Sequence, residues 1–353
     1  MFWLWLLVGL VAVILLVSRF YLSGEDLGMY DAHSGEQFSG ESGSSEERSK
    51  VEASLKVGVG PIRQQPRRQQ LKLLREYIDN MAEGLDLPAT ITPVDAGGVP
   101  AEWVVAPESD PNRRLLYIHG GGFVMGSPRS HRNVTAHFAH LCGLTVLSID
   151  YRLMPEHARL AGVEDCQTAY EWLLENGPDG ASAPEHIYIA GDSAGGNLSL
   201  MMSAWSRDHG SRKADGVVAL SPVTDLTLGS PSMKANIETD AMLGPMFGQL
   251  AKIPRPLLLW MGWFQNRTTP ANPVLSPVFG DLSNLPPTLV HASESEMLRD
   301  DGRRYVNRAV SQGSVAKLQT WPNVVHVWHM FYPDLTEARE AWEEIRTFIA
   351  DLG

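Results

Sequence analysis

The chain has 353 residues and a formal net charge of −12, from 29 Lys and Arg against 41 Asp and Glu. This acidic balance excludes the broad basic surface that nucleic-acid binding requires, so we expect no nucleic-acid partner. A basic cluster between residues 63 and 72 is too short to change that expectation. The length exceeds that of a typical domain, but α/β folds with a large sheet often reach it as one unit.

The N-terminal segment is strongly apolar. Residues 1–17 carry no charged side chain, and the apolar run resumes after Ser18 and Arg19. About twenty helical residues cross a hydrocarbon core of about 30 Å. A cleaved signal peptide is the alternative, but there is no basic start and no small-x-small cleavage site before Ser23. We expect residues 1–22 to be an uncleaved single-pass membrane anchor, with Arg19 weakly favouring a cytoplasmic location for the rest of the chain.

A polar stretch follows, from residue 23 to residue 65, with a run rich in Ser, Gly and Glu from Ser39 to Glu47. Such a composition cannot bury an apolar core and is typical of flexible segments. The sequence therefore predicts a flexible linker over residues 23–65, which connects the anchor to a folded domain over residues 66–353.

Two segments of this domain are not expected to form strands of the sheet. After Pro66, apolar residues recur at helical spacing, and Gly84 marks the expected end of the helix. The second segment lies between Leu226 and Pro273 and is rich in Met, Leu and Trp. Flexible apolar side chains of this kind pack well and also suit an apolar ligand.

Strands and helices alternate from residue 115 onward. The strand-like runs cover residues 115–118, 144–149, 186–190, 217–220, 288–291 and 318–321. The helical patterns cover residues 164–175, 195–208, 303–310 and 336–350. This alternation predicts an α/β fold with a mainly parallel central sheet and helices on both faces.

The sequence Gly191-Asp192-Ser193-Ala194-Gly195 directly follows the third of these strands. A Ser between small residues at a strand-to-helix turn is typical of a nucleophile elbow, in which a sharp turn lifts the hydroxyl clear of the sheet. The alternative is a Gly-rich turn without a chemical role.

A second motif, residues 119–123 with the sequence His-Gly-Gly-Gly-Phe, follows the first strand. The tetrahedral intermediate of acyl transfer carries a negative oxygen, and glycines let backbone N–H groups approach that oxygen closely. We expect the amides of Gly121, Gly122 and Ala194 to form an oxyanion hole. A flexible glycine loop is the alternative.

These motifs resemble the hormone-sensitive-lipase branch of the α/β hydrolases, a group that includes many microbial carboxylesterases. The resemblance covers most of the chain after about residue 66. Its other motifs are Asp150-Tyr-Arg-Leu-Met-Pro-Glu-His157, Ser221-Pro-Val-Thr-Asp-Leu226 and Leu285-Pro-Pro-Thr-Leu-Val290. It implies an esterase with a Ser-His-acid triad and a small helical cap, which we place at about residues 66–98 and 226–273.

The triad order in this fold is Ser, acid, His, so the general base lies late in the chain. After His291 the sequence offers His326 and His329. His326 resembles the His of the family's His-Val-aromatic loop, and we predict that it is the base. For His119 we expect a role in orienting the oxyanion loop rather than in proton transfer.

Residues 293–301 offer four carboxylates for the acid. Family members usually have Asp-x-Leu here, and alignment on Leu298 places Glu296 at the acid position, a replacement that the chemistry permits. Asp300 is the alternative acid. We expect Glu294, Asp301 and the upstream Asp225 to cap helices or face solvent.

We therefore predict a serine carboxylesterase for short-to-medium-chain hydrophobic esters, with the catalytic residues Ser193, Glu296 and His326. An amidase, deacetylase or acyltransferase with the same nucleophile is the main alternative, and a non-catalytic binding protein is another. No metal or cofactor is expected, because neither metal-ligand spacings nor phosphate or dinucleotide motifs are present. Cys142 and Cys166 are expected as buried thiols. The expected partners are an ester substrate and, through the anchor, a membrane, and a homodimer is left open.

Overall fold

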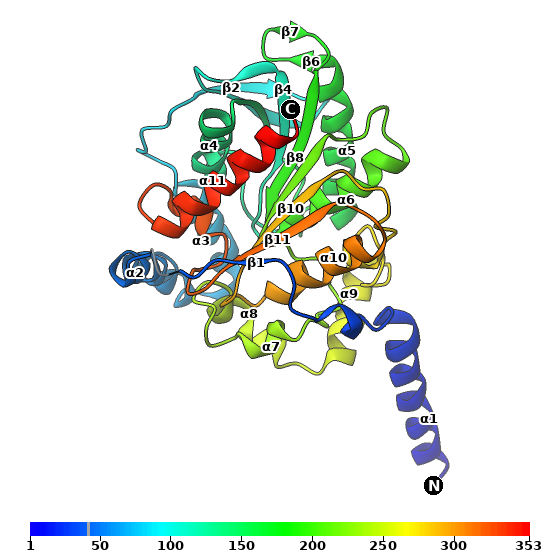
Figure 1. The fold of residues 1–353 in the computed structure, drawn as a ribbon. Coiled ribbons are helices and arrows are strands. Elements are labelled where there is room, and N and C mark those ends of the chain that lie inside the picture. Colours follow the sequence, from blue (N-terminus) through cyan, green and yellow to red (C-terminus); the bar gives the residue numbers. More distant parts are fainter. Residues whose placement is uncertain (41–42) are drawn as a thin grey trace.

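The computed structural model describes residues 1–40 and 43–353 and contains a central nine-stranded sheet between two layers of helices (Figure 1). In spatial order the strands are β1 (Glu36–Gln37), β11 (Ala316–Trp321), β10 (Thr288–Ser293), β9 (Gly216–Leu220), β8 (His186–Asp192), β4 (Asp110–Ile118), β5 (Leu144–Ile149), β3 (Pro100–Val105) and β2 (Thr90–Asp95). All neighbouring strands are parallel except the pairs β5–β3 and β3–β2. The predicted mainly parallel α/β fold is confirmed.

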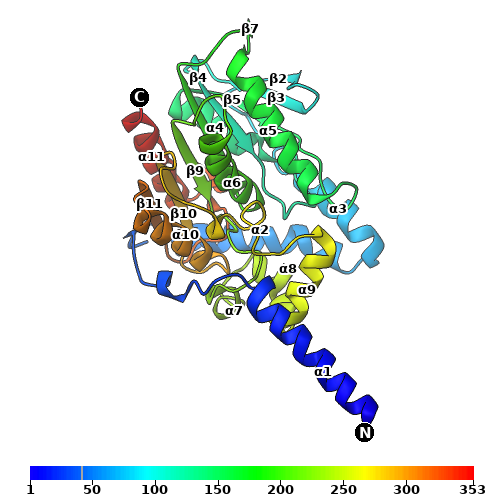
Figure 2. The ribbon, with the colours of Figure 1, turned by 90° about the vertical axis from the view of Figure 1, so that its right-hand side faces the viewer.

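The central strands are apolar along their whole length because helices cover both of their sides. Helices α4 (Arg132–Cys142) and α11 (Thr336–Asp351) pack on one face. Helices α5 (Arg159–Glu175), α6 (Ala194–Asp208) and α10 (Arg299–Ser311) pack on the other. Figure 2 shows α5 and α6 on one side of the sheet and α11 on the opposite side. The four predicted helices of this region lie within or close to the observed bounds.

Short elements complete the domain. They are the hairpin of β6 (Asn176–Gly177) and β7 (Gly180–Ala181) and the 3₁₀ turns η3 (Arg129–His131), η4 (Pro277–Phe279) and η5 (Trp328–Phe331). Both cysteines are free and buried, as expected.

Four helices lie at the end of the sheet where the parallel strands reach their carboxyl ends (Figure 1). They are α3 (Arg67–Asp79), α7 (Ser232–Ala235), α8 (Leu243–Ala251) and α9 (Arg255–Asn266), and we refer to them as the cap helices. The predicted first cap segment, residues 66–98, is too long. Its second part, residues 90–95, is the edge strand β2, which pairs antiparallel with β3 and belongs to the sheet.

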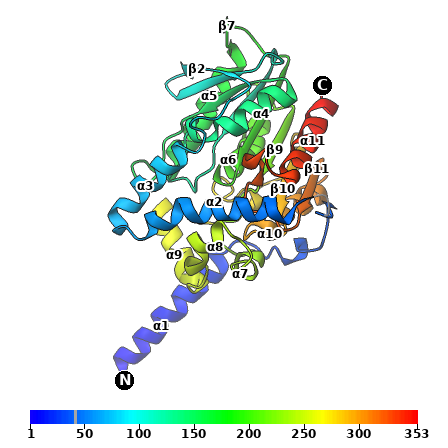
Figure 3. The ribbon, with the colours of Figure 1, turned by 90° about the vertical axis from the view of Figure 1, so that its left-hand side faces the viewer.

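The apolar N-terminus forms α1 (Phe2–Val17), which continues as the π-helical turn η1 (Ser18–Leu22). No residue of α1 is buried, and the helix extends away from the domain (Figures 1 and 3). Within the described residues, Phe2–Leu22 is one helix that is long and apolar enough to cross a membrane.

The prediction of a flexible linker over residues 23–65 is wrong for the described part of that segment. It contains the turn η2 (Gly28–Tyr30), strand β1 and the 19-residue helix α2 (Ser45–Arg63), which crosses the domain in Figure 3. The segment is held by polar contacts, which composition does not reveal. Asp31 accepts a hydrogen bond from Nε of Arg304 at 2.6 Å, and Glu47 accepts one from the amide of Thr336 at 2.9 Å.

Candidate active site

Ser193 stands at the junction of β8 and α6, in a strained backbone conformation with φ 52° and ψ −114°. Positive φ is unfavourable for a residue with a Cβ and persists where the surroundings enforce it. Here the amide of Ser193 donates to the carbonyl of Leu220 at 2.8 Å, which fixes the turn against β9. The side chain remains partly exposed. The strand-turn-helix predicted for the elbow is confirmed.

The glycines that flank Ser193 are required by packing. A Cβ on Gly191 would lie 2.4 Å from the carbonyl oxygen of Ile118, and one on Gly195 would lie 1.9 Å from the same atom. Because this oxygen belongs to the backbone of the neighbouring strand β4, it cannot move away. The elbow therefore fits between the strands only with glycine at both positions.

The loop after β4 carries glycines for a similar reason. Gly121 has φ 111°, and a Cβ there would lie 2.1 Å from the carbonyl oxygen of Met125. Gly122 has φ 63°, and a Cβ there would fit without a clash, because the nearest atoms, from the side chains of Val124 and Phe247, would be 4.0 Å away. Within the described part of the chain, the amides of Gly121, Gly122 and Ala194 donate no hydrogen bond. They are free to bind a ligand oxygen.

Asp192 connects this glycine loop to the elbow. Its buried carboxylate accepts hydrogen bonds from the Tyr117 hydroxyl at 2.6 Å and the Gly120 amide at 3.0 Å, and His131 Nε2 lies 3.3 Å away. Burial raises the pKa of Asp192, but the charge of His131 and these hydrogen bonds outweigh burial and bring the pKa down to about 2. The carboxylate is therefore ionised and holds the two loops in register.

His119 lies in the same buried layer. Burial lowers its pKa to about 3, so the imidazole stays neutral. Its ring stacks on that of Tyr151 at 4.3 Å between centroids, and the Tyr151 hydroxyl donates to the His119 carbonyl at 3.0 Å. These contacts support the orienting role predicted for His119.

Arg75, on cap helix α3, was not singled out by the sequence. Its guanidinium donates to the carbonyl of Val124 at 2.7 Å and to that of Met154 at 2.9 Å, and it forms two 2.8 Å hydrogen bonds with the carboxylate of Glu156. Val124 follows the glycine loop directly. Arg75 thus connects a cap helix to the glycine loop. The sequence could not reveal this role, because two of the acceptors are backbone carbonyls.

On the other side of the site, Glu296 and His326 form a buried pair. Oε2 of Glu296 accepts a hydrogen bond from His326 Nδ1 at 2.6 Å, while Oε1 accepts one from the Ser293 amide at 3.0 Å. Burial lowers the pKa of His326, but the hydrogen bond and charge of Glu296 outweigh it and raise the pKa above its ordinary value. Within the described residues, Nε2 of His326 is buried without a hydrogen-bond partner.

The other candidate acids have different partners. Asp300 accepts from Arg303 at 2.8 Å and from the Ser232 amide at 2.8 Å. Asp301 accepts from the Thr224 amide at 2.7 Å. Glu294 lies 3.4 Å from Nη2 of Arg303, and Asp225 accepts from the Thr227 amide at 2.8 Å. Each of these carboxylates stabilises local structure, and Glu296 is the one that contacts His326.

His329, the other late histidine, faces away from this pair. Its Nε2 lies 3.0 Å from Nδ1 of His291, whose Nε2 in turn lies 2.9 Å from Oε1 of Gln319. Burial holds the pKa of His329 well below its ordinary value. Within the described residues, no three His, Cys, Asp or Glu side chains converge as metal ligands would.

Known proteins share this architecture. A family model described as alpha/beta hydrolase fold matches residues 115–330. An acetyl-hydrolase of Streptomyces hygroscopicus is 35% identical over 256 residues, which cover 72% of this chain and 81% of that protein. The carboxylesterase/phospholipase LipF of Mycobacterium tuberculosis is 34% identical over 247 residues, which cover 68% of this chain and 62% of LipF.

A solved structure extends this likeness over most of the chain. The crystal structure of an esterase from the bacterial hormone-sensitive lipase family has a TM-score of 0.74 and 32% identity, and the match covers 88% of this chain and 99% of that one. The chain belongs to the hormone-sensitive-lipase-like family of α/β hydrolases, and it is a carboxylic ester hydrolase.

Proposed function

We propose that this enzyme is a membrane-anchored serine carboxylesterase with the triad Ser193, His326 and Glu296. The observation that carries the proposal is the Glu296–His326 pair: a carboxylate fixes Nδ1 of a buried imidazole, and Nε2 has no hydrogen-bond partner among the described residues. That arrangement suits a general base for a nearby hydroxyl. The strained backbone of Ser193 supports its role as the nucleophile.

In the proposed reaction, His326 Nε2 takes the proton of the Ser193 hydroxyl as its oxygen attacks the ester carbonyl carbon. The carbonyl oxygen becomes negative and binds the amides of Gly121, Gly122 and Ala194. The tetrahedral intermediate then collapses: the ester bond breaks, and His326 gives its proton to the departing alcohol oxygen. Water, activated by the same imidazole, hydrolyses the acyl-enzyme and restores Ser193.

We propose short-to-medium-chain hydrophobic esters as substrates, because apolar side chains of the cap lie close to the glycine loop. Cζ of Phe247, on α8, lies 4.0 Å from where a Cβ of Gly122 would be. A structural neighbour of 32% identity and TM-score 0.74, EstE5, was soaked with p-nitrophenyl butyrate. An acyl chain bound beside these amides would contact the cap.

The test is hydrolysis of p-nitrophenyl esters from acetate to palmitate by the full-length protein in detergent. We expect turnover to peak at short or middle chains and to vanish in Ser193→Ala. The matched control is Ser203→Ala on the same helix, whose buried hydroxyl has no hydrogen-bond partner within the described residues. Loss of activity in both variants, or in neither, would refute the assignment of Ser193. Turnover of anilides but of no ester would point to an amidase.

A further inference from the structure

The membrane-proximal part of the N-terminal helix is packed against the cap. The indole Nε1 of Trp260, in the middle of α9, donates to the hydroxyl of Ser18 at 3.0 Å. The hydroxyl of Thr269, just after α9, donates to the carbonyl of Tyr21 at 3.2 Å. Ser18 and Leu22 are buried here, whereas no residue of α1 is buried. Helix α9 therefore lies directly beside η1, where the apolar helix joins the domain (Figure 2).

This packing fixes the depth of α9 if the N-terminal helix spans a bilayer. The 21 residues from Phe2 to Leu22 are only just long enough, at about 1.5 Å each, to cross a hydrocarbon core of about 30 Å. The last turn, η1, must then lie at the boundary between hydrocarbon and headgroups. Because α9 packs on that turn, α9 lies at the same level.

The outer surface of α9 matches this position. Leu257, Met261 and Phe264 follow one another at helical spacing and are 56%, 53% and 56% exposed. No charged residue occurs between Arg255 and Arg267, at the two ends of the helix. On η1, Phe20 and Tyr21 are also exposed. Apolar residues with aromatic neighbours and flanking arginines are typical of helices that lie in a membrane interface. We refer to the three α9 residues as the α9 stripe.

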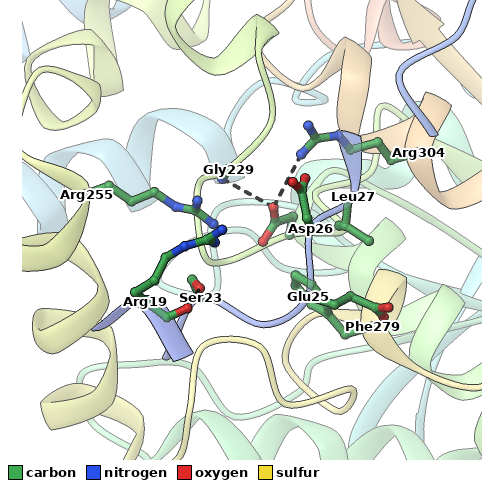
Figure 4. Close-up of a pocket in the computed structure, with 10 residues that line it drawn as sticks. Arg19, Ser23, Glu25, Asp26, Leu27, Gly229, Arg255, Phe279 and Arg304 are labelled. Atoms are coloured by element: carbon green, nitrogen blue, oxygen red, sulfur yellow. Dashed lines mark hydrogen bonds and ion pairs between the residues drawn. The ribbon is translucent and has the colours of Figure 1, made fainter. Parts of the chain in front are cut away.

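A polar cavity of about 160 Å³ adjoins α9 at its N-terminal end (Figure 4). Arg19 of η1 and Arg255 of α9 extend into it from the same side, and Arg304 lies on the opposite side. Glu25, Asp26 and Asp225 are among the other lining residues. A cavity lined by charged side chains is compatible with the headgroup layer and not with the hydrocarbon core, so it marks the same level of the bilayer as η1.

Helix α9 is also connected to the proposed active site. Nε2 of Gln265 lies 3.5 Å from the sulfur of Met154, whose amide donates to the carbonyl of Phe123 at 2.9 Å. Phe123 ends the glycine motif. Helix α9 is thus two contacts away from the proposed oxyanion loop.

We propose that the α9 stripe is a second membrane contact, which seats the cap in the bilayer surface so that the enzyme takes its ester from the membrane. The proposal rests on the membrane anchor and the esterase activity of the proposed function. A second copy of the chain could also cover an apolar stripe, but the bilayer is favoured because α9 packs on η1, at the end of the apolar helix that would enter the bilayer. An exposed apolar surface of this kind is unfavourable in water.

The membrane contact can be tested by fluorescence quenching in the full-length protein, reconstituted in phosphatidylcholine vesicles. The variant Met261→Cys is labelled with an environment-sensitive dye, and nitroxide-labelled lipids serve as the quencher. The matched control is Val315→Cys, a 70% exposed position next to the amino end of β11, whereas α9 lies beyond the carboxyl ends of the strands. Both native cysteines are buried, which directs the dye to the new thiol.

We expect loss of fluorescence at position 261 and none at position 315. An unquenched label at 261 would overturn the proposal, and so would self-quenching that grows with protein density, because it would indicate a second copy on the stripe. Neither result depends on catalysis. A quenched label in a protein without esterase activity would refute the proposed function and leave the membrane contact standing.

The link to substrate delivery needs a second measurement. In Leu257→Ser/Met261→Ser/Phe264→Ser, we expect turnover of a long-chain ester dissolved in the vesicles to fall by about tenfold, the factor that corresponds to about 1.4 kcal/mol. Turnover of water-soluble p-nitrophenyl acetate should stay unchanged. The control Val310→Ser/Val315→Ser removes two apolar side chains that are 53% and 70% exposed elsewhere. Equal loss on both substrates, or equal effects of both variants, would contradict delivery through the stripe.

Discussion

Glu296 and His326, thirty residues apart in the chain, are joined by a 2.6 Å hydrogen bond between Oε2 and Nδ1 in a buried layer. The second oxygen of Glu296 is occupied by the Ser293 amide, so the carboxylate cannot rotate away from the imidazole. This holds the imidazole in one orientation, with Nε2 directed away from the carboxylate. This geometry suits the orienting role that we propose for Glu296.

The first prediction concerns this carboxylate. In Glu296→Gln, the imidazole loses the negative charge that stabilises its protonated form and the acceptor that selects its tautomer. We expect kcat to fall by about two to four orders of magnitude, with little change in KM. Steady-state kinetics on p-nitrophenyl butyrate would measure this.

The control is Asp300→Asn, which breaks the contacts to Arg303 and the Ser232 amide but leaves His326 untouched. We expect a lower Tm and nearly normal kcat in the folded fraction. The reverse pattern, with activity lost only in Asp300→Asn, would transfer the acid role to Asp300.

The second prediction is a shift in the pH profile. The general base must be neutral, so kcat/KM should rise with pH through the pKa of His326, which Glu296 raises above its usual value near 6.5. In Glu296→Gln the raising influence disappears while burial, which lowers the pKa, remains. We therefore expect the midpoint of the acid limb to move to lower pH in the residual activity of the variant. An unchanged or higher midpoint would show that Glu296 does not tune His326.

The third prediction tests Arg75 as a positioning residue. In Arg75→Gln, the carbonyls of Val124 and Met154 lose their shared donor, and the glycine loop is less well fixed. A small displacement of the oxyanion amides costs catalysis more than binding, so we expect kcat to fall by about tenfold to a hundredfold and KM to change little. Lys72→Ala on the same helix is the control, because the Lys72 side chain is 81% exposed and forms an ion pair with the nearby Glu76.

Arg75→Lys separates positioning from charge. A lysine keeps the positive charge but has three donors on one nitrogen, too few for the four hydrogen bonds that Arg75 forms. We expect it to restore little of the lost kcat. Full rescue by lysine would show that charge alone matters at this position.

The fourth prediction contrasts two glycines. In Gly195→Ala the new methyl group would meet the backbone of Ile118 and His119, so we expect little folded protein, visible as loss of the cooperative thermal transition. Gly122 has space for a methyl group and pays only for its positive φ, about 1 to 2 kcal/mol. Gly122→Ala should therefore fold, with a modestly lower Tm. Normal folding of Gly195→Ala would contradict the close approach of β4 to the elbow.

The sequence predicted the elements whose signal is local. The apolar strand before Ser193 and the glycines around it lie within ten residues, and their pattern alone predicts the turn that the structure contains. The pairing of Glu296 with His326 was predicted from the triad order of the fold and from the family resemblance, because strand β10 and the His326 loop occupy fixed places in this fold. Edge strand β2 was missed because four of its six residues are exposed and its hydrophobic pattern is weak.

Residues 23–65 show what composition cannot predict. Their polar side chains suggested disorder, yet Glu25 pairs with Arg308, and the carbonyl of Tyr30 accepts a hydrogen bond from Asn307 at 2.8 Å. Stability here comes from partners more than 250 residues away in the sequence, which no local pattern contains. The contacts of Arg75 are of the same long-range kind.

Strand β1 has a consequence for assembly. Glu36 and Gln37 pair with Gln319 and Thr320 on the outer edge of β11, and the Phe38 ring stacks on that of Trp321 at 4.1 Å. An uncovered edge strand invites a neighbouring molecule to add its own strand, which is a common route to both dimers and aggregates. The chain blocks this route with its own N-terminal segment. Proteolytic removal of that segment would therefore uncover the edge of β11 and leave it free to pair with a strand of another molecule.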